Sequence, residues 1–411
     1  MPHYPSKGES VWNHTVDAVQ YPELTHDFSI DVAVIGAGIA GLTTAYLLKQ
    51  RGIKVAVFEK YRIGDSVSGY TTAKVTSQHG LAYTELIEKF GKKDAALYGE
   101  ANEAAINMIE DIIKAERIEC DWRREDNYVF TDKPEEVMKL KREAKDAQSL
   151  GLPASYVEKI PLSVPVRGAV RFKNQATFHV VKYLHGLAKA INGDGSYVFE
   201  QTKASGVTDG DSTAHFRTPH GKVKARHIVL ATNIPSPIKD HIAYGLFEFP
   251  SRSYLIAGKI DKKIPGMYIN TANPTRSILQ TTLGGEEWLL VGGEGHLVGM
   301  SGPAKNRYAT LEAYAKEHFG LKDVQYRWST WDYIAYDHMP LVGKLFANSR
   351  NLYTATGFRK WGMTNGTVAA MILTDTLSGA KNPWAETFRS TRLSAFTSMP
   401  KGLIQGFGSH K

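Results

Sequence analysis

Apolar positions near the start of the chain fall into two short runs separated by a segment with helical spacing. Residues 31–35 and 54–58 are apolar after a polar first residue, whereas residues 40–51 repeat apolar side chains at helical intervals. Gly52 follows the helical segment, as is common where a helix ends. The pattern predicts a strand, a helix and a second strand, which together form a βαβ unit.

Charged, amphipathic segments follow between about residues 82 and 151. Residues 94–117 and 134–150 place apolar side chains among acids and lysines, which predicts two helices. Pro134 suits the first turn of the second helix, because a backbone N–H at that position would have no helical partner. We therefore expect this region to be mainly helical.

Strand-like patterns dominate the second half of the chain. Residues 227–231 form an apolar run after a polar lead, and residues 250–335 alternate apolar and polar positions with breaks at two Gly-Gly pairs. The alternation predicts an antiparallel sheet. Residues 352–356 predict a last strand, and residues 365–377 predict a last helix.

Length and composition indicate a globular protein of two domains. The 411 residues are too many for one ordinary core, and 42% hydrophobic with 22% charged residues is ordinary globular composition. The formal net charge is +8, but the basic residues form no dense block, so no nucleic-acid partner is indicated.

Cysteine content and hydropathy exclude several classes. Cys120 is the only cysteine, so the chain forms no internal disulfide, and no multi-cysteine metal or iron–sulfur site is predicted. It lies in a charged stretch that we expect to be helical. The first 28 residues contain no signal-peptide core, and no apolar run reaches the roughly 20 residues of a membrane span. We expect a cytoplasmic protein.

A glycine fingerprint joins the first strand to the first helix. Gly36 allows a tight turn, Gly38 lets a pyrophosphate approach the backbone, and Gly41 lets the helix pack on the strand. Glu59 lies 23 residues after Gly36, at the end of the second strand, where a carboxylate accepts both ribose hydroxyls. The complete set in register predicts a dinucleotide site.

The nature of the dinucleotide stays open on this motif. Glu59 suits an unphosphorylated ribose, which disfavours NADP and leaves NAD and FAD. A reductase with two dinucleotides needs a second fingerprint, and Gly293-Glu-Gly295 has the wrong spacing and is interpreted as a turn between strands.

Three further segments carry a resemblance to a known family. They are Gly69-Tyr-Thr-Thr-Ala-Lys-Val-Thr-Ser-Gln-His-Gly80, Asp337-His-Met-Pro-Leu-Val-Gly343 and Ala355-Thr-Gly-Phe-Arg-Lys-Trp-Gly-Met-Thr-Asn-Gly366. From about residue 31 to 384 the chain resembles the D-amino-acid oxidase-like superfamily of FAD oxidoreductases, which includes glycine, sarcosine and γ-glutamylputrescine oxidases. It is most similar to a bacterial subgroup that often carries a C-terminal Rieske domain. The implied cofactor is FAD.

The resemblance implies four groups of cofactor contacts. The fingerprint contributes Gly36, Gly38, Ala40 and Gly41. The surroundings of the adenosine and pyrophosphate contribute Glu59, Lys60 and Arg62. The segment beside the isoalloxazine contributes Ser68, Thr71, Thr72 and Ala73. The remaining strand ends and the flavin N1–C2=O edge contribute Ala231, Thr232, Gly357, Lys360, Trp361, Gly362, Met363 and Thr364.

The chain departs from the family at three points. Arg359 stands where these proteins usually have a small residue, and Asn233 replaces the usual glycine of an Ala-Thr-Gly strand end. A Rieske cluster needs two cysteines and two histidines, so we expect no Rieske domain in this chain.

The candidate catalytic residues are Lys360, His79, Arg276 and Arg252. Lys360 is expected to stabilise the negative charge of the reduced flavin. His79 could accept a proton or be a structural hydrogen-bonding residue, and either arginine could bind a substrate carboxylate or lie at the surface. Four aromatic residues could surround an amine or simply pack in the sheet: Tyr254, Trp331, Tyr333 and Trp361.

The expected fold is α/β, with a Rossmann-type FAD-binding domain interleaved with a substrate domain of antiparallel or mixed sheet plus helices. The segments are an N-terminal arm (1–27), the FAD domain (28–80, 166–240 and 336–385), the substrate domain (81–165 and 241–335) and a tail (386–411). Flavin and substrate are expected to meet between the domains.

The expected activity is FAD-dependent oxidation of a C–N bond in a small amine or amino acid, with oxygen or a separate acceptor taking the electrons. Two alternatives stay open: a dehydrogenase that passes electrons to a protein, and a non-catalytic electron-transfer or flavin-sensing module.

Overall fold

The computed structural model describes residues 8–238, 247–273, 275–298 and 304–398. The chain divides into two compact units, each assembled from three segments. Unit 1 comprises residues 1–18, 67–183 and 251–331, and unit 2 comprises residues 19–66, 184–250 and 332–411. The strands β11 (Glu248–Lys259) and β15 (Tyr326–Ala335) each run from one unit into the other.

Unit 2 is built on a twisted sheet whose parallel strands have the order expected of a dinucleotide-binding fold. The parallel strands lie in the order β7-β2-β1-β10-β17, so the first strand of the chain is central and the order reverses beside it. Antiparallel β16, β8 and β9 extend the sheet. The bounds are β1 Phe28–Ile35, β2 Val55–Phe58, β7 Tyr197–Phe199, β8 Ser205–Thr208, β9 Ala214–Thr218, β10 Gly221–Leu230, β16 Leu341–Lys344 and β17 Leu352–Thr356.

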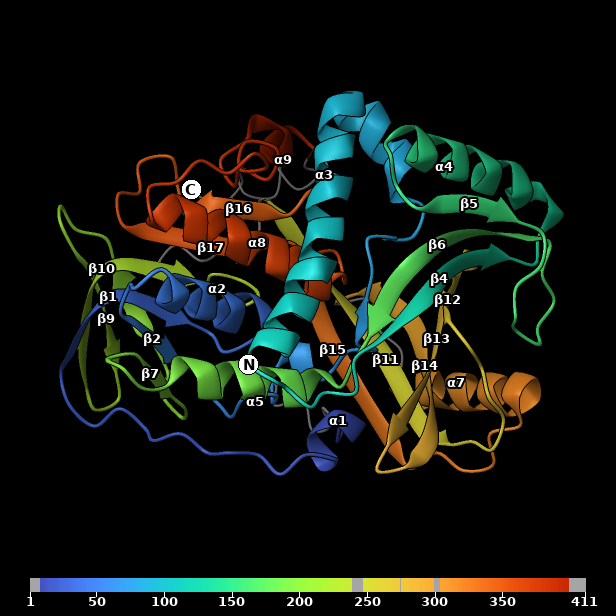
Figure 1. Ribbon diagram of the computed structural model, residues 1–411, viewed down its shortest axis with the longest axis horizontal. Helices are drawn as coiled ribbons and strands as arrows, with labels where there is room; N and C mark the ends of the chain where they lie inside the picture. The colour runs from blue at the N-terminus through green and yellow to red at the C-terminus, as the bar shows by residue number, and fades with distance from the viewer. Residues whose placement is uncertain (1–7, 239–246, 274, 299–303, 399–411) are drawn as a thin grey trace, which may run out of the picture. The chain divides into compact units, whose positions relative to one another are not determined.

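Two helices, α2 (Ile39–Gln50) and α8 (Gly362–Leu377), follow the parallel strands β1 and β17 and pack on each other (Figure 1). A Cβ on Gly366 of α8 would lie 2.9 Å from Cγ2 of Ile39 and 3.4 Å from the backbone N of Ala40. Both helices therefore begin at the carboxyl-terminal edge of the same sheet, which is where α/β folds bind ligands. Two further helices belong to this unit in whole or in large part: α5 (Val180–Ile191) and α9 (Leu393–Thr397).

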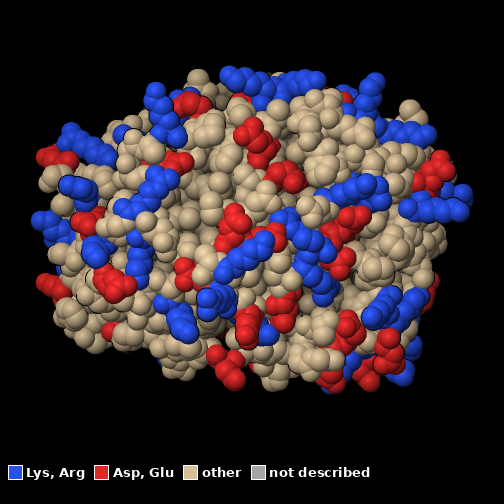
Figure 2. Space-filling view, viewed as in Figure 1, with Lys and Arg blue, Asp and Glu red and all other residues tan. Residues whose placement is uncertain are grey.

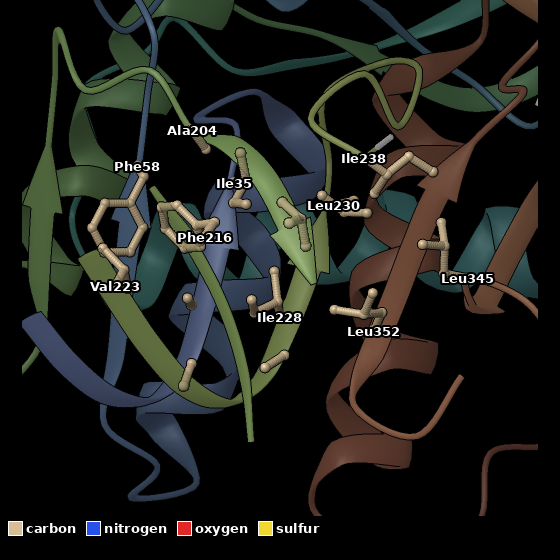
Figure 3. Packing of buried hydrophobic residues seen from close by; sticks show 14 of the residues in the cluster. Ile35, Phe58, Ala204, Phe216, Val223, Ile228, Leu230, Ile238, Leu345 and Leu352 are labelled. Atoms are coloured by element: carbon tan, nitrogen blue, oxygen red, sulfur yellow. The ribbon is translucent and has the colours of Figure 1, made fainter. Parts of the chain in front are cut away.

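One hydrophobic cluster of unit 2 lies on the other face of the sheet and joins residues far apart in sequence (Figure 3). Phe58 stacks on Phe199 with ring centroids 5.4 Å apart, and its edge meets Phe216 at 5.1 Å. Ile35, Ile228 and Leu352 bring β1, β10 and β17 into the same cluster. Aromatic and branched side chains from these strands thus fix the positions of the strand ends.

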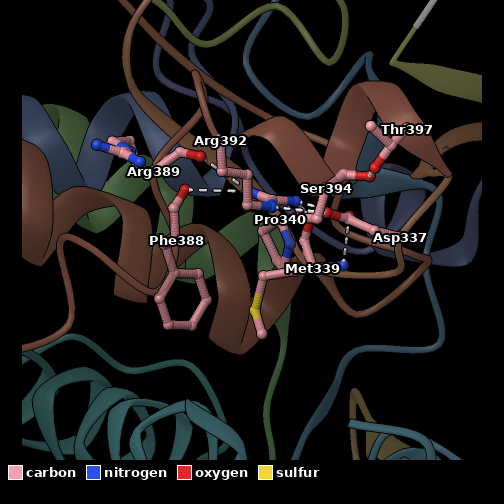
Figure 4. Close-up of polar contacts among 8 residues, drawn as sticks. All are labelled: Asp337, Met339, Pro340, Phe388, Arg389, Arg392, Ser394 and Thr397. Atoms are coloured by element: carbon pink, nitrogen blue, oxygen red, sulfur yellow. Dashed lines mark hydrogen bonds and ion pairs between the residues drawn. The ribbon is translucent and has the colours of Figure 1, made fainter. Parts of the chain in front are cut away.

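Residues 386–398 are an integral part of unit 2 (Figure 4). The buried carboxylate of Asp337 receives two 2.7 Å hydrogen bonds from the Arg392 guanidinium and one of 2.8 Å from the Ser394 hydroxyl. Arg392 also donates to the carbonyls of Pro340 and Met339. The expected tail therefore contains an anchor for the 337–343 motif, because a buried carboxylate without its guanidinium partner would be costly.

Unit 1 contains a mixed sheet in the order β15-β11-β14-β13-β12-β4-β6-β3, with β5 paired to β6. Most pairs are antiparallel, but β12 pairs with β4 in parallel. The bounds not yet given are β3 Lys74–Val75, β4 Arg123–Thr131, β5 Ala154–Val157, β6 Gly168–Thr177, β12 Met267–Asn270, β13 Arg276–Leu283 and β14 Glu286–Leu297. The helices are α1 Val11–His14, α3 Ala82–Ala115, α4 Val137–Ser149 and α7 Ala304–Phe319, with 3-10 turns at Val67–Gly69 and Pro134–Glu136.

The α/β fold class is as expected, and the local differences have physical reasons. The region 82–151 is not wholly helical: β4 runs through it, and Cys120 lies in a bend outside any helix. Residues 250–335 also contain the helix α7, whose pattern of apolar positions is weak. Residues 67–80 and 166–183, expected with the FAD domain, belong to the compact unit 1. Residues 8–18, expected as an irregular arm, contain α1 and join the same unit.

On the face drawn in Figure 2, lysine and arginine side chains are largely interspersed with acidic ones. Surface ion pairs of the described residues include that of Arg142 with Glu88 at 2.6 Å. This distribution agrees with the absence of a dense basic block in the sequence.

Candidate functional site

The glycine fingerprint forms a tight turn at the carboxyl end of β1 in unit 2. Gly36 has φ +107°, and a Cβ there would lie 2.5 Å from the Ala231 carbonyl oxygen. A Cβ on Gly41 would lie 1.9 Å from the Gly36 carbonyl oxygen. Any side chain at these positions would displace backbone, so both require glycine. Gly38 is the N-cap of α2, and no side chain caps the helix there.

Glu59 lies at the end of β2 with its carboxylate turned toward this turn. Its Oε2 accepts the Ala37 N–H at 2.8 Å, and its Oε1 accepts the Tyr61 N–H at 2.9 Å. The residue is only 6% exposed, and burial raises its pKa against the opposing effect of the backbone hydrogen bonds. The Lys60 N–H is a third backbone donor to this carboxylate. A carboxylate has about four lone-pair sites, so Glu59 still has acceptor capacity for a hydroxyl donor.

Lys60 and Arg62 extend from the same loop in different ways. Lys60 is exposed, and its Nζ lies 4.4 Å from the centre of the Tyr61 ring. Arg62 donates to the buried Glu200 carboxylate at 2.9 Å, which also accepts the Ile63 N–H at 2.7 Å. Arg62 thus links the loop after β2 to the loop after β7 through an ion pair. This structural role is not evident from the sequence.

The strand end Ala231-Thr232-Asn233 lies against the fingerprint. Ala231 donates its N–H to the Ile35 carbonyl at 2.9 Å, and the Thr232 hydroxyl donates to the Ile234 carbonyl at 2.6 Å. Asn233 has φ +67°. Glycine and asparagine adopt this left-handed conformation most readily, so the asparagine preserves the backbone geometry of the usual glycine.

A strained turn connects β17 to α8. Trp361 donates its N–H to the Phe358 carbonyl at 2.9 Å, and Arg359 and Lys360 between them have φ +53° and +67°. Positive φ at both central residues is the pattern of a type I′ turn, which normally contains asparagine or glycine. The small residue expected in place of Arg359 therefore has a conformational reason. Each left-handed residue of this kind costs about 1 kcal/mol or more.

Two buried acids lie against this turn. Asp332 accepts the backbone N–H groups of Tyr333, at 2.9 Å, and of Lys360. The Glu248 carboxyl is hydrogen-bonded to the Thr356 hydroxyl at 2.9 Å, and its Oε2 would lie 3.4 Å from a Cβ on Gly357. Burial raises the pKa of Asp332 to about 6, and burial followed by repulsion from Asp332 raises that of Glu248 well above its ordinary value. Neither acid was anticipated, because each lies in a strand far from the motif.

Lys360 itself is solvent-accessible in this structure. Removal of water by the surrounding protein lowers the pKa of its ammonium, and the Asp332 carboxylate opposes that effect. The two interacting groups thus differ in exposure: the Asp332 carboxylate is buried, whereas the Lys360 ammonium is accessible to solvent.

In unit 1, the N-terminal segment holds the loop that contains Ser68, Thr71, Thr72 and Ala73. The Ser10 hydroxyl donates to the Gly69 carbonyl at 2.7 Å, and the Trp12 indole N–H donates to the Thr71 carbonyl at 2.8 Å. Both Ser10 and Trp12 are fully buried. The N-terminal segment thus supports a loop that the sequence placed in the site.

His79 has both ring nitrogens engaged inside unit 1. Nδ1 is hydrogen-bonded to the Tyr98 hydroxyl, and Nε2 to the Thr76 carbonyl at 2.8 Å. The residue is 2% exposed. This arrangement favours the structural interpretation of His79 over proton transfer with a substrate.

Arg276 lies on the face of the unit 1 sheet that α7 covers. It forms a 2.7 Å ion pair with the buried Glu294, and its guanidinium lies 5.6 Å from the ring of Tyr314 in α7. A Cβ on Gly292 would instead contact Thr72, and adjacent residues of a strand face opposite sides. A Cβ on the neighbouring Gly293 would lie 3.1 Å from Nη1 of Arg276. Arg276 and Thr72 are therefore on opposite faces of the sheet.

Arg252 lies among aromatic side chains of unit 1. Its guanidinium is 5.3 Å from the ring of Tyr254 and 6.0 Å from that of Trp331, and it donates to the Ser329 hydroxyl at 2.7 Å. The Tyr254 hydroxyl pairs with His296 at 3.2 Å. Tyr254 and Trp331 thus gather around an arginine of the chain itself.

Lys74 is a cation on the Thr72 side of this sheet. Its Nζ donates to the Ser277 hydroxyl at 2.8 Å and to the Tyr268 carbonyl, and Ser277 pairs in register with Gly292. The side chain is buried, and loss of solvation lowers its pKa to about 7. Sequence inspection placed Lys74 in a motif without assigning it a role, because its burial depends on contacts with distant strands.

Comparisons with known proteins agree with this geometry. Residues 31–376 match the family of FAD-dependent oxidoreductases named DAO. The Bacillus subtilis protein YhfW, named for a Rieske 2Fe-2S iron–sulfur protein, is 33% identical over 385 residues, which cover 93% of this chain and 75% of that protein. The γ-glutamylputrescine oxidoreductase of Escherichia coli is 24% identical over 398 residues, covering 92% of this chain and 89% of its own length.

Solved structures show the same fold. The glycine oxidase of Geobacillus kaustophilus superposes with a TM-score of 0.75 at 17% identity, covering 89% of this chain and 99% of that one. The L-amino acid deaminase of Proteus myxofaciens gives a TM-score of 0.74 at 14% identity, covering 90% and 95%.

The chain belongs to the FAD-dependent oxidoreductase family. Its cofactor is therefore FAD, and the protein is an FAD-dependent oxidoreductase enzyme. The residues of unit 2 fit that cofactor. The turn at Gly36 and Gly41 has no room for side chains, which leaves its backbone open to a pyrophosphate. The helices α2 and α8 begin at the same sheet edge without side-chain caps, so their first N–H groups can bind an anion. The buried Glu59 carboxylate can still accept a hydrogen bond from a ribose hydroxyl.

Within the residues described, this flavoenzyme has no helix long and apolar enough to cross a membrane. The same residues contain no group of three or more His, Cys, Asp or Glu side chains placed to hold a metal ion.

Proposed function

We propose that this flavoenzyme oxidises the C–N bond of a small amine or amino acid. The supporting observation is a family match over most of the chain, together with relatives and structural neighbours whose names specify amines and amino acids: γ-glutamylputrescine, glycine, L-proline and L-amino acids. FAD, when bound, would supply the two-electron oxidation by taking a hydride from the C–H bond next to the substrate nitrogen, and residues at its N1–C2=O edge would stabilise the negative charge of the reduced form.

The residues proposed to hold FAD come mainly from unit 2. The turn 36–41 and the N-terminus of α2 would accept the pyrophosphate, because the backbone N–H groups and the helix dipole favour an anion. Glu59 would accept the ribose hydroxyls, and Lys60 would add positive charge nearby. Ala231 and Thr232 would line the same edge.

The segment 357–364 is proposed to meet the negative end of the flavin. The backbone N–H groups of Arg359 and Lys360 are already bonded to the Tyr333 carbonyl and the Asp332 carboxylate. The donors proposed here are therefore the first N–H groups of α8, at Gly362, Met363 and Thr364, together with the Lys360 ammonium.

On the substrate side, the proposal assigns the loop 68–73 to the flavin ring. Arg252 is set aside as a carboxylate ligand, because it lies with Tyr254 against Tyr308 of α7, on the sheet face that carries Arg276. Arg276 is set aside as a substrate ligand because Glu294 balances its charge beneath α7. His79 is set aside as a proton acceptor because both its nitrogens are engaged. Lys74 shares the Thr72 face of the sheet and replaces them as the ionisable candidate.

The decisive test is anaerobic reduction of the purified holoprotein by a panel of amines and amino acids. We expect bleaching of the flavin absorption band by members of that panel and by no alcohol or 2-hydroxy acid of similar size. FAD should be the flavin released by heat. A folded holoprotein that no amine or amino acid reduces, but that hydroxy acids do, would contradict the proposal.

The electron acceptor is a second question. YhfW, which is named for a Rieske iron–sulfur protein, favours a dehydrogenase that passes electrons to a protein as the alternative to an oxidase. Mixing the substrate-reduced enzyme with air distinguishes the two. An oxidase re-oxidises within its turnover time and releases hydrogen peroxide, whereas a dehydrogenase stays reduced until an artificial acceptor is added.

A further inference from the structure

The turn at residues 358–361 is held in its conformation by contacts with β15. Two consecutive non-glycine residues with positive φ are unfavourable in isolation, so surrounding contacts must hold them. Those contacts are the Arg359 N–H to the Tyr333 carbonyl at 3.2 Å, a backbone bridge between Ile334 and Phe358, and the Lys360 N–H to the Asp332 carboxylate. Of these three, the contact to Asp332 is the one that depends on a side chain.

Asp332 and Glu248 lie on the two strands that run from one unit into the other. Asp332 is 7% exposed in β15, and Glu248 is 1% exposed in β11. The described charged or titratable groups that face Asp332 are the Lys360 ammonium, the Glu248 carboxyl and the Tyr333 phenol. Asp332 therefore faces one accessible cation and one buried acid, and repulsion between the two acids favours protonation of one of them.

We propose that Asp332 is a positioning residue for Lys360, holding the strained turn through the Lys360 N–H and offsetting the Lys360 charge when its carboxylate is ionised. Glu248, bonded to Thr356 beside Gly357, stays protonated and leaves the single negative charge to Asp332. The inference rests on the proposed function in one respect, the placement of Lys360 at the negative end of FAD.

The proposal gives Asp332 two separable effects. As a hydrogen-bond acceptor, it keeps the turn in the conformation that presents Lys360. As a charge, it weakens the pull of Lys360 on electrons, so ionised Asp332 lowers the reduction potential of bound FAD and protonated Asp332 raises it. Burial raises the pKa of Asp332 to about 6, which places the change between about pH 5 and 7.

The test compares Asp332→Asn and Asp332→Ala with the parent holoenzyme. Asn keeps an acceptor oxygen for the Lys360 N–H but has no charge, so the potential of Asp332→Asn should match the parent near pH 5 and exceed it near pH 8. Ala removes the acceptor, so its FAD Kd should rise about tenfold or more. The Kd of the Asn variant should stay within about threefold of the parent.

Two further variants show whether Asp332 acts through Lys360. In a Lys360→Met background, Asp332→Asn should change the potential by less than half as much as in the parent, because the charge it offsets has gone. Asp337→Asn is the matched control, because Asp337 is a buried aspartate of the same unit that forms an ion pair with Arg392. The change weakens that ion pair and should lower thermal stability without changing the pH dependence of the potential.

Three results would overturn the inference: a potential difference independent of pH, an effect undiminished in the Lys360→Met background, or an FAD Kd unchanged in Asp332→Ala. Reductive titration with dithionite needs no substrate. Failure of the amine oxidation proposal and failure of this inference are therefore distinguishable.

Discussion

Glu59 shows at the scale of one residue how far a motif alone can define a site. Its position after β2 follows from the spacing of the fingerprint, and the structure adds the hydrogen bonds that it accepts from the backbone N–H groups of Ala37, Tyr61 and Lys60. The spacing thus predicted where the carboxylate lies. Its second task, bracing the turn, depends on the closed fold and was not readable from the sequence.

Glu59→Ala should weaken FAD binding strongly. The change leaves two ribose hydroxyls without an acceptor, at a cost of roughly 2–4 kcal/mol, or about 30-fold to 1000-fold in Kd. The matched control is Glu143→Ala in unit 1, because Glu143 is equally buried and accepts two backbone N–H groups, from Tyr83 and Thr84 at 2.8 and 2.9 Å. The control should lose stability and keep its FAD affinity. Titration of the apoproteins with FAD, followed by fluorescence, measures both; equal losses of affinity would refute the assignment.

The four candidate catalytic residues separate clearly once their environments are known. His79, Arg276 and Arg252 were chosen by residue type and by the segment in which they lie, and all three are engaged in contacts that a sequence does not display. The face of Arg276 depends on long-range strand pairing, and β11 carries a register shift between Arg252 and Tyr254 that breaks simple alternation. Residue type and segment suggest candidates, but strand register decides which face of the sheet each arginine occupies.

At the scale of elements, the turn between β17 and α8 is where local sequence and local structure disagree. Arginine and lysine occupy positions that favour asparagine or glycine, so the conformation is imposed by the strands around it. Such disagreement between sequence and conformation is expected at functional sites, where strain is retained for placement.

Substitutions at Arg359 should change the free energy of unfolding according to how well the new residue tolerates a positive φ. Arg359→Gly should leave the free energy of unfolding within about 0.5 kcal/mol of the parent, because relief of the positive φ is offset by the entropy of the glycine in the unfolded chain. Arg359→Val should lose about 1–2 kcal/mol, since a β-branched residue tolerates positive φ poorly. Arg217→Val in β9 removes the same charge from an exposed strand position and should have little effect. Urea unfolding measures all three, and a Val variant at position 359 as stable as the Gly variant would contradict the strain.

Elements of the nucleotide unit could be predicted well, because each is defined by local apolar runs and glycines. β1, α2, β2, β17 and α8 lie within a few residues of the expected bounds. Short strands such as β3 and β7 were missed, since two or three residues carry too little pattern and form only against distant partners.

At the scale of the whole molecule, the interleaving of segments was predictable in kind, because the resemblance indicated two domains built from alternating segments. The ends of those segments were not. Residues 8–18 join unit 1 through buried contacts of Ser10 and Trp12. Residues near 392 join unit 2 through the buried Arg392 guanidinium and through backbone hydrogen bonds to Val342. Both attachments depend on isolated hydrogen bonds to distant segments, which leave no periodic signal in a sequence.

The attachment of the N-terminal segment should make stability depend on pH through His179. Its Nε2 pairs with the Thr15 hydroxyl at 3.0 Å, its Nδ1 accepts the Lys182 N–H at 3.3 Å, and its ring lies edge-on to Trp12 at 5.2 Å. Burial lowers the pKa of His179 to about 4 from an ordinary 6.5. A lowered folded-state pKa means that the unfolded chain binds the proton first, so this stability is present above pH 6.5 and is lost as pH falls toward 4.

His179→Gln should therefore flatten the pH dependence of unfolding, because glutamine offers a donor and an acceptor but does not titrate. The parent should lose up to about 3 kcal/mol relative to the variant between pH 7.5 and 4, the free energy of the full pKa shift. His220→Gln is the matched control, since that histidine is exposed and pairs with Glu23 at the surface of unit 2. Its curve should run parallel to that of the parent. Urea unfolding at a series of pH values, followed by tryptophan fluorescence, gives the comparison. Parallel curves for the parent and His179→Gln would mean that the histidine is not held neutral and that the segment around Trp12 is secured by other contacts.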